Sequence, residues 1–407
     1  MNMIPLPVSN ISPLSTGLAA MVLLIMMPAL AQELPPQPGR YMPFYPGMYL
    51  TGAYSHDTRD SSYDQTGTLR DSAAPQAGGK TKLATDNVLS TFTWHFPMFE
   101  SYGLPFISST THMARVTLRY SKASTDGALK SFISSKPDLM EKGDGLGDTT
   151  LEFGSFLYGA QDWRTRTQNP FTLLALVGVN VPTGVYESNA PNNTSSNTWA
   201  FHGKLGAQWQ PWTGGYLEAG GGYRSYAGNE EPEFGALAPH RQGKDRFWDL
   251  SVTQRIWQSL YVGVFLTQRK GDANEYRNPQ FTPNPDAPTP PANSDNYPTP
   301  GVYFDKGTEL STLGLSLQYF LTQHWLAALH FTKPISGRSG QFQLPYTNRT
   351  PANCIVGSLT CQTSDSGSSV LVDGMGPARS FGTNNVTLTL SYNFDLGDFF
   401  SCTGCKQ

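Results

Sequence analysis

The chain has 407 residues, with 28 Lys and Arg against 31 Asp and Glu, so its formal net charge is −3. This near-neutral balance excludes a nucleic-acid binder that relies on attraction to phosphates, because such a protein needs a basic surplus. Aromatic residues make up 12% of the chain and 40 residues are glycine. That composition argues against a disordered chain and favours a large β-structure.

The N-terminus carries the one long apolar run, residues 18–31 (LAAMVLLIMMPALA), which ends in the small-x-small sequence Ala29-Leu30-Ala31. We interpret residues 1–31 as a secretory signal peptide, with a buried core helix as the alternative. The segment departs from the usual pattern because it contains no Lys or Arg. Since no other apolar stretch reaches about 18 residues, a helical membrane protein is excluded. The mature chain is therefore expected to be exported, in a Gram-negative bacterium.

After a proline-rich periplasmic lead-in at 32–46, the dominant pattern is alternation of apolar and polar residues with period two, which is typical of β-strands. In the last such segment Val386, Leu388 and Leu390 alternate with Thr387 and Thr389. The alternation predicts about twelve strands, near residues 47–56, 87–96, 107–120, 147–159, 171–181, 198–209, 215–226, 246–256, 260–269, 308–320, 324–333 and 384–394.

Long and short connections alternate between these strands. Bacterial outer-membrane barrels have long external loops, short periplasmic turns and an even strand number, whereas a soluble β-sandwich has no reason for such regularity. Aromatic residues such as Trp94, Trp209, Trp257 and Trp325 stand beside the short turns, where a membrane-interface girdle is expected. The sequence thus predicts an all-β fold: a transmembrane antiparallel up-and-down β-barrel in the outer membrane at 47–394, followed by a periplasmic tail at 395–407.

Strand parity assigns the polar face of each strand to the barrel lumen. The lumen-lining candidates are mixed in charge and comprise His95, Arg115, Arg119, Glu152, Lys204, Gln208, Glu218, Arg224, Asp249, Arg255, Gln318 and His330. Opposite charges on neighbouring strands, such as Lys204 and Glu218, are expected to pair. Gly206, Gly220 and Gly222 leave inward positions without side chains. These features fit either a solute path or a polar network that fills a narrow barrel.

The four cysteines are too few for a disulfide framework. Cys354 and Cys361 lie in one polar loop and are candidates for a disulfide, whereas Cys402 and Cys405 form a lone CxxC at the C-terminus. Zinc needs four ligands, and no Cys or His cluster stands near this motif, so we expect no metal site and no cofactor. No nucleophile motif flanks His95 or His330, so we expect no catalytic residues and no enzyme activity.

Four short segments carry a resemblance to a known family. Pro46-Gly47-Met48-Tyr49 opens the first strand and Asp60 follows in the first loop, while Gly145-Leu146-Gly147-Asp148 leads into the fourth strand and Val181-Pro182-Thr183-Gly184 closes the fifth. In this order they resemble the meta-pathway phenol-degradation family of outer-membrane proteins, over the first half of the mature chain. The resemblance implies a barrel associated with uptake of aromatic compounds.

Two classes of function follow. The first is a channel or carrier for passive uptake of small aromatic or apolar molecules, with Tyr226 and Phe265 as candidates near the external mouth. The second is a structural or adhesion barrel with a plugged lumen, acting through its external loops. The expected partners are outer-membrane lipid, a small-molecule solute and, through the last strand, the barrel-assembly machinery; no nucleic acid is expected. The final strand ends at Phe394 in the pattern that this machinery reads, yet residues 395–407 follow it.

Overall fold

The computed structural model describes the part of the chain that forms the barrel wall and some of its connections. The described residues are 47–63, 67–71, 73–74, 79–97, 111–127, 144–159, 170–187, 193–230, 240–278, 301–304, 307–322, 324–338, 341–345, 361–363, 369–373 and 381–395. The predicted signal peptide, the lead-in segment, Cys354 and the C-terminal CxxC lie outside these residues. Of Cys361 only the strand backbone is described.

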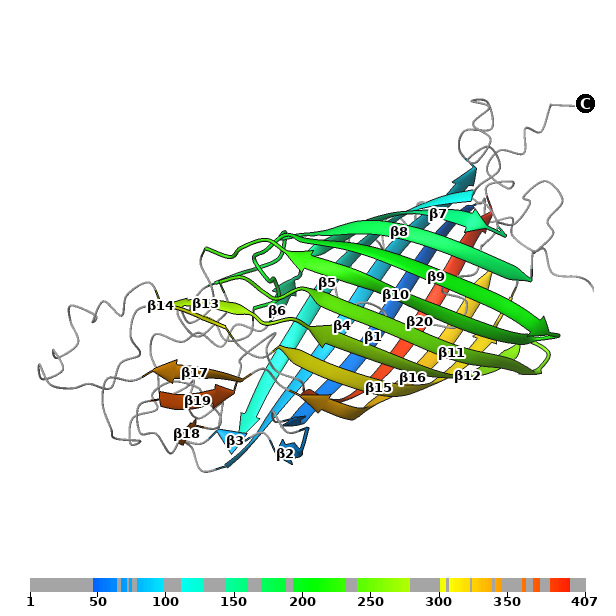
Figure 1. The fold of residues 1–407 in the computed structure, drawn as a ribbon. Helices are drawn as coiled ribbons and strands as arrows, with labels where there is room; N and C mark the ends of the chain where they lie inside the picture. Colours follow the sequence, from blue (N-terminus) through cyan, green and yellow to red (C-terminus); the bar gives the residue numbers. More distant parts are fainter. Residues whose placement is uncertain are drawn as a thin grey trace, which may run out of the picture.

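Twelve strands form a closed antiparallel barrel, as the alternation predicts (Figure 1). Each strand pairs with its neighbours along the chain, and the first strand also pairs with the last, which closes the sheet. The strands are β1 (Gly47–Tyr63), β4 (Gly79–Pro97), β5 (Thr111–Gly127), β7 (Thr149–Tyr158), β8 (Phe171–Val181), β9 (Ala200–Trp212), β10 (Gly215–Tyr226), β11 (Asp245–Trp257), β12 (Leu260–Gly271), β15 (Thr308–Phe320), β16 (Trp325–Arg338) and β20 (Phe381–Asp395).

Several strands are longer than the alternation indicates, chiefly at their external ends. The ladder of β1 and β4 continues to Arg59 and Leu83, and that of β4 and β5 reaches Thr81 and Gly127. Backbone hydrogen bonds do not depend on side-chain polarity, so pairing continues where both faces of the strand meet water. The apolar alternation ends with the membrane, and the predicted bounds therefore stop short.

The connecting segments hold further short strands that the sequence analysis did not predict. They are β2 (Leu69–Asp71), β3 (Ala73–Ala74), β6 (Asp144–Leu146), β13 (Glu275–Asn278), β14 (Gly301–Phe304), β17 (Gln341–Pro345), β18 (Cys361–Thr363) and β19 (Ser369–Asp373). β13 pairs with β14, and β17, β19 and β18 form a sheet of their own. Figure 1 shows these two small sheets beyond one end of the barrel.

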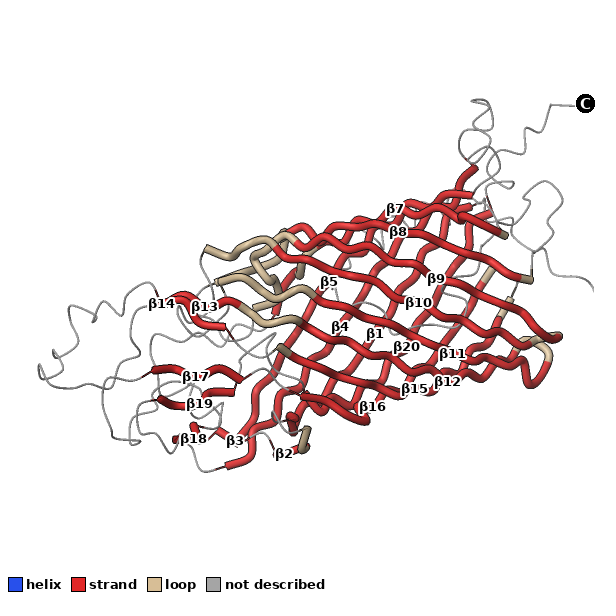
Figure 2. Tube along the Cα trace, viewed as in Figure 1, coloured by secondary structure: helices blue, strands red, loops and turns tan. Residues whose placement is uncertain are grey.

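The opposite end carries the short turns. The chain reverses at 213–214 between β9 and β10 and at 258–259 between β11 and β12, with positive φ at Gly214 and Gln258. The first residue of β1 and the last of β20 pair at this same end. Figure 2 shows the tight turns at this end of the barrel, away from the small sheets. Short turns and paired termini mark this end as periplasmic.

The outer face is apolar and the inner face is polar. Along β9, Phe201, Leu205 and Trp209 are exposed on the outside, whereas Lys204 and Gln208 are buried inside. Exposed aromatic side chains gather near the periplasmic end, and the rings of Trp325 and Tyr392 lie 4.6 Å apart between centroids. An apolar band with an aromatic girdle is the surface that lipid requires. The protein is an outer-membrane β-barrel.

No helix in the described part of the chain is long and apolar enough to cross a membrane.

Candidate functional site in the barrel interior

The structure places most of the lumen-lining candidates on the buried face of their strands. His95, Glu152, Lys204, Gln208, Glu218, Asp249, Gln318 and His330 are buried, and Arg115, Arg119 and Arg224 are half-buried. Arg255 differs because its side chain is exposed. It lies at the periplasmic end of β11, where its backbone still pairs with Tyr261 before the register shift that precedes the turn.

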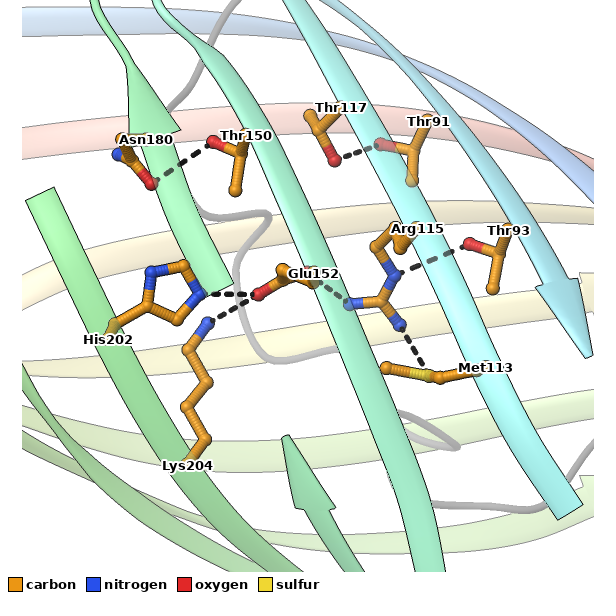
Figure 3. A network of polar contacts seen from close by, with 10 residues as sticks. All are labelled: Thr91, Thr93, Met113, Arg115, Thr117, Thr150, Glu152, Asn180, His202 and Lys204. Carbon is orange, nitrogen blue, oxygen red and sulfur yellow. Dashed lines mark hydrogen bonds and ion pairs between the residues drawn. The ribbon is translucent and has the colours of Figure 1, made fainter. Parts of the chain in front are cut away.

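Glu152 is the centre of a charged network on the inner wall (Figure 3). Its Oε2 atom lies 3.1 Å from Nη1 of Arg115 on β5, and its Oε1 atom lies 3.2 Å from Nζ of Lys204 on β9. Nε2 of His202 lies 3.0 Å from the same Oε1. Arg115 also donates from Nε to Thr93 Oγ1 at 3.3 Å. Strand parity predicts Arg115, Glu152 and Lys204 on the inner face but does not predict their contacts, and His202 is not among the predicted lumen residues.

Gly178 on β8 makes this network possible. The strand register aligns Glu152 with Gly178 and Gly178 with His202. A Cβ atom at Gly178 would lie 2.4 Å from His202 Nε2 and 2.8 Å from Glu152 Cγ. Because the middle strand presents no side chain, the residues on its two flanking strands meet directly above its backbone.

The register does not align Lys204 with Glu218, the pair expected from the sequence. The register places Lys204 beside Gly222 and Glu218 beside Gln208, so Lys204 bonds with Glu152. Ser251 donates to Glu218 at 3.1 Å. Gly222 is also not an open wall position, because a Cβ there would lie 2.6 Å from Phe247 Cζ.

An apolar patch lies beside the charged network, also on the inner face. It consists of Met113, Phe156, Leu174 and Leu176, all buried. The register aligns Leu176 with Lys204, and Arg115 Nη2 donates to Met113 Sδ at 3.8 Å. A patch of this kind is unusual because the interior of such barrels is generally polar.

A second polar network joins β1, β4 and β20 farther towards the external end. Asn87 Nδ2 donates to Asp57 Oδ2 at 2.6 Å and to Ser55 Oγ at 3.0 Å, and Asn385 donates to Asp57 as well. Ser121 Oγ donates to Asn87 Oδ1 at 3.2 Å. Asp57 is not among the predicted lumen residues because the predicted first strand ends at residue 56. If the alternation of inward and outward side chains is continued to residue 57, it places Asp57 on the inner face.

At the external ends of β10, β11 and β12, Tyr226 and Arg269 both donate to Asp245. Tyr226 therefore lies at the mouth, as a hydrogen-bonded polar group. Phe265 lies in the middle of β12 rather than at the mouth, and its side chain is buried.

Comparison with known protein families shows to which family the chain belongs. Residues 66–285, more than half of the chain, match the family described as "Putative MetA-pathway of phenol degradation". The chain belongs to this family. A search of curated protein sequences finds no significant match.

Solved structures show a similar fold at low sequence identity. The COG4313 outer membrane channel from Pseudomonas putida F1 is 13% identical with a TM-score of 0.57, over 88% of this chain and 100% of that one. The TodX monoaromatic hydrocarbon channel (a deltaS2 mutant) is 10% identical with a TM-score of 0.35, over 86% of this chain and 91% of that one. A Pseudomonas aeruginosa FadL homologue is 8% identical with a TM-score of 0.34, over 86% and 90%. The likeness to the COG4313 channel is one of fold.

Two segments that carry the family resemblance contact each other at the external end. A Cβ at Gly184 would lie 2.6 Å from the carbonyl carbon of Gly147 and 2.7 Å from the oxygen of Leu146. Asp148 accepts hydrogen bonds from Ser195 Oγ, from Ser196 N at 2.8 Å and from Ser196 Oγ at 2.7 Å. The glycines allow the two backbones to pack closely, and Asp148 fastens the loop after β8 to the start of β7.

No group of three or more Cys, His, Asp or Glu side chains that suits a metal ion occurs among the described residues. His95 and His330 lie on different parts of the inner wall: His95 aligns with Met113, and His330 aligns with Ser316.

On the outer face, His112 Nδ1 lies 2.8 Å from Ser155 Oγ, and its ring stacks on Phe153 with centroids 5.8 Å apart. This pair is outside the interior site.

Proposed function

We propose that this barrel is a channel or carrier through which small aromatic or apolar molecules cross the outer membrane passively. The observation that carries the proposal is the apolar patch of Met113, Phe156, Leu174 and Leu176 inside the polar barrel, next to the cations Arg115 and Lys204. A general water-filled pore has no need of an inward apolar patch.

The patch and the cations together suit an amphipathic aromatic solute. The ring of such a solute packs against Phe156 and the aliphatic side chains, and a phenolate or carboxylate group interacts with Arg115 or Lys204. Glu152 holds both cations in place by hydrogen bonds. Membership of a family described by phenol degradation supports the same class of solute.

A second candidate is a structural barrel with a plugged lumen. The observation that favours it is that charged side chains of the inner wall pair with each other, as Arg115 and Lys204 do with Glu152 and as Arg269 does with Asp245. Paired charges of this kind stiffen a wall without serving a solute. The small sheets of the external connections offer such a barrel a surface for contact.

Single-channel conductance of the refolded mature protein in planar bilayers separates the two candidates. We expect conductance steps that phenol and benzoate block in a concentration-dependent manner. Steps that neither solute affects indicate a general pore, and a folded, heat-modifiable barrel without any steps supports the plugged barrel.

We also infer that the barrel-assembly machinery recognises β20. The inference is supported by the outward aromatic pair Tyr392 and Phe394 at the periplasmic end of this last strand, with ring centroids 4.6 Å apart. Replacing Phe394 with Ala is expected to slow insertion into the outer membrane in cells while leaving refolding in detergent unchanged. Equal insertion rates contradict the inference.

A further inference from the structure

A row of buried polar side chains without hydrogen-bond partners crosses the inner wall on β11, β15 and β16, away from the charged network on β5, β7 and β9. The register aligns Thr253 on β11 with Gly263 on β12, Gly263 with Ser316 on β15, and Ser316 with His330 on β16. Thr253 and Ser316 are each 2% exposed and His330 is fully buried. We call Thr253, Ser316 and His330 the polar row.

The polar atoms of the row have no hydrogen-bond partner within the described part of the chain. This holds for Thr253 Oγ1, Ser316 Oγ and both ring nitrogens of His330. An unsatisfied buried polar group costs about 1–3 kcal/mol, and folded proteins leave few of them. Three such side chains on one row therefore indicate a place where a ligand supplies the missing hydrogen bonds.

One aromatic side chain, Phe265, borders the polar row. Phe265 follows Gly263 by two residues on the same face of β12 and is buried. Its ring lies over Gly314 on β15, where a Cβ would come within 2.1 Å of Phe265 Cζ. The ring is edge-on to His330, with centroids 6.4 Å apart and an interplanar angle of 66°. Gly263 itself contributes no side chain, so the wall between Thr253 and Ser316 is backbone.

The chemistry of the row matches a hydroxyl group on an aromatic ring. Neighbouring strands lie about 5 Å apart, so Ser316 and His330 can reach one ligand oxygen together. A hydroxyl both donates and accepts, as Ser and His side chains do. Thr253, Ser316 and Phe265 carry no charge, so a neutral hydroxyl suits this part of the wall better than a phenolate.

We propose that Thr253, Ser316 and His330, together with Phe265, form a binding station for a neutral hydroxylated aromatic molecule, of which phenol is the simplest. The proposal rests on the proposed function and deepens it, because it names the side chains that hold the solute during passage. This station is distinct from the charged network, where Arg115 and Lys204 suit anionic solutes.

The test measures binding of phenol and of toluene, which lacks the hydroxyl, to the refolded full chain by equilibrium dialysis against matched protein-free micelles. In His330→Leu and Ser316→Ala we expect phenol to bind about tenfold more weakly, the effect of about one lost hydrogen bond, while toluene binding stays unchanged. Thr91→Val is the matched control, because Thr91 is an inward hydroxyl on β4 already bonded to Thr117 at 3.2 Å, and it should leave both affinities unchanged.

A second variant guards against misfolding. His330→Gln keeps a donor and an acceptor, so phenol binding should recover most of what His330→Leu loses, and heat-modifiable migration reports whether each variant is folded. Unchanged phenol affinity in folded His330→Leu and Ser316→Ala overturns the station, as does an equal loss for phenol and toluene. If phenol blocks the wild-type barrel and both variants equally in bilayers, the binding station is contradicted and the proposed function stands. A folded wild type that neither binds nor conducts overturns the proposed function as well.

Discussion

His202 Nε2 lies 3.0 Å from Glu152 Oε1 although β9 and β7 are separated by β8. Adjacent strands lie about 5 Å apart, so two side chains on alternate strands normally have a third between them. Here the intervening residue is Gly178, and its backbone forms the floor of the contact. One residue without a side chain thus connects Arg115, Glu152, His202 and Lys204 into a single network.

Replacing Gly178 with Ala should break this contact. The new methyl group would lie 2.4 Å from His202 Nε2 and 2.8 Å from Glu152 Cγ, so at least one of them must move. We expect the barrel to lose about 1–3 kcal/mol of stability, measured by urea unfolding in lipid vesicles.

Gly203→Ala is the matched control for that change. Gly203 is the neighbour of His202 but lies on the outer face, and its nearest Cβ contact would be Leu176 O at 3.9 Å. Unfolding midpoints that fall equally in the two variants contradict the role assigned to Gly178.

Glu152→Gln should leave Arg115 and Lys204 without their carboxylate. Breaking one partner of a buried ion pair typically costs about 3–5 kcal/mol, and the freed positive charge should also make the channel more selective for anions. The reversal potential in a KCl gradient measures the selectivity. Glu309→Gln at the external end, where Glu309 Oε2 lies 3.3 Å from Arg338 Nη2, is the control and should cost about 0–1 kcal/mol. No shift in reversal potential for a folded Glu152→Gln barrel contradicts the prediction.

Asp148→Ala should release the loop that follows β8. The variant loses the hydrogen bonds that Asp148 accepts from Ser195 and Ser196, and the buried hydroxyl of Ser195, left unpaired, costs about 1–3 kcal/mol. Hydrogen exchange at the amide of Ser196 should become faster, while amides in the middle of β8 keep their protection. The control is Asp144→Ala, because Asp144 is exposed on β6. Equal exchange rates at the Ser196 amide in wild type and Asp148→Ala would contradict the prediction.

Leu205→Arg tests the orientation of the wall in lipid. Leu205 is exposed on the outer face of β9, and an arginine facing the middle of the bilayer costs about 2–4 kcal/mol, falling to about 0–1 near the interfaces. Lys204→Arg, one residue earlier on the inner face, should cost little. Folding free energies in vesicles that are the same for both variants would show that Leu205 does not face lipid near the midplane.

The twelve strands and their inner and outer faces could be predicted because both depend on local order in the sequence. On β9 the alternation from Phe201 to Trp209 is visible residue by residue, since successive side chains point to opposite sides of a strand. Where polarity no longer alternated, as beyond His56 on β1, the prediction ended early and Asp57 was missed.

The partners of the inward residues were not predictable in the same way. Lys204 and Glu218 lie on consecutive strands, but nothing in the sequence indicates that Lys204 bonds with Glu152, which lies two strands away. Likewise, nothing in the sequence aligns Thr253, Ser316 and His330, which come from three strands separated by long stretches of chain.

A twelve-stranded outer-membrane barrel with a polar interior could be inferred from the sequence, because strand periodicity and the alternation of loop lengths are properties of neighbouring residues. Which interior side chains meet depends on the three-dimensional fold. Closure of the barrel sets one stagger for every strand pair, and that stagger places Gly178 between Glu152 and His202 and brings Ser316 beside His330.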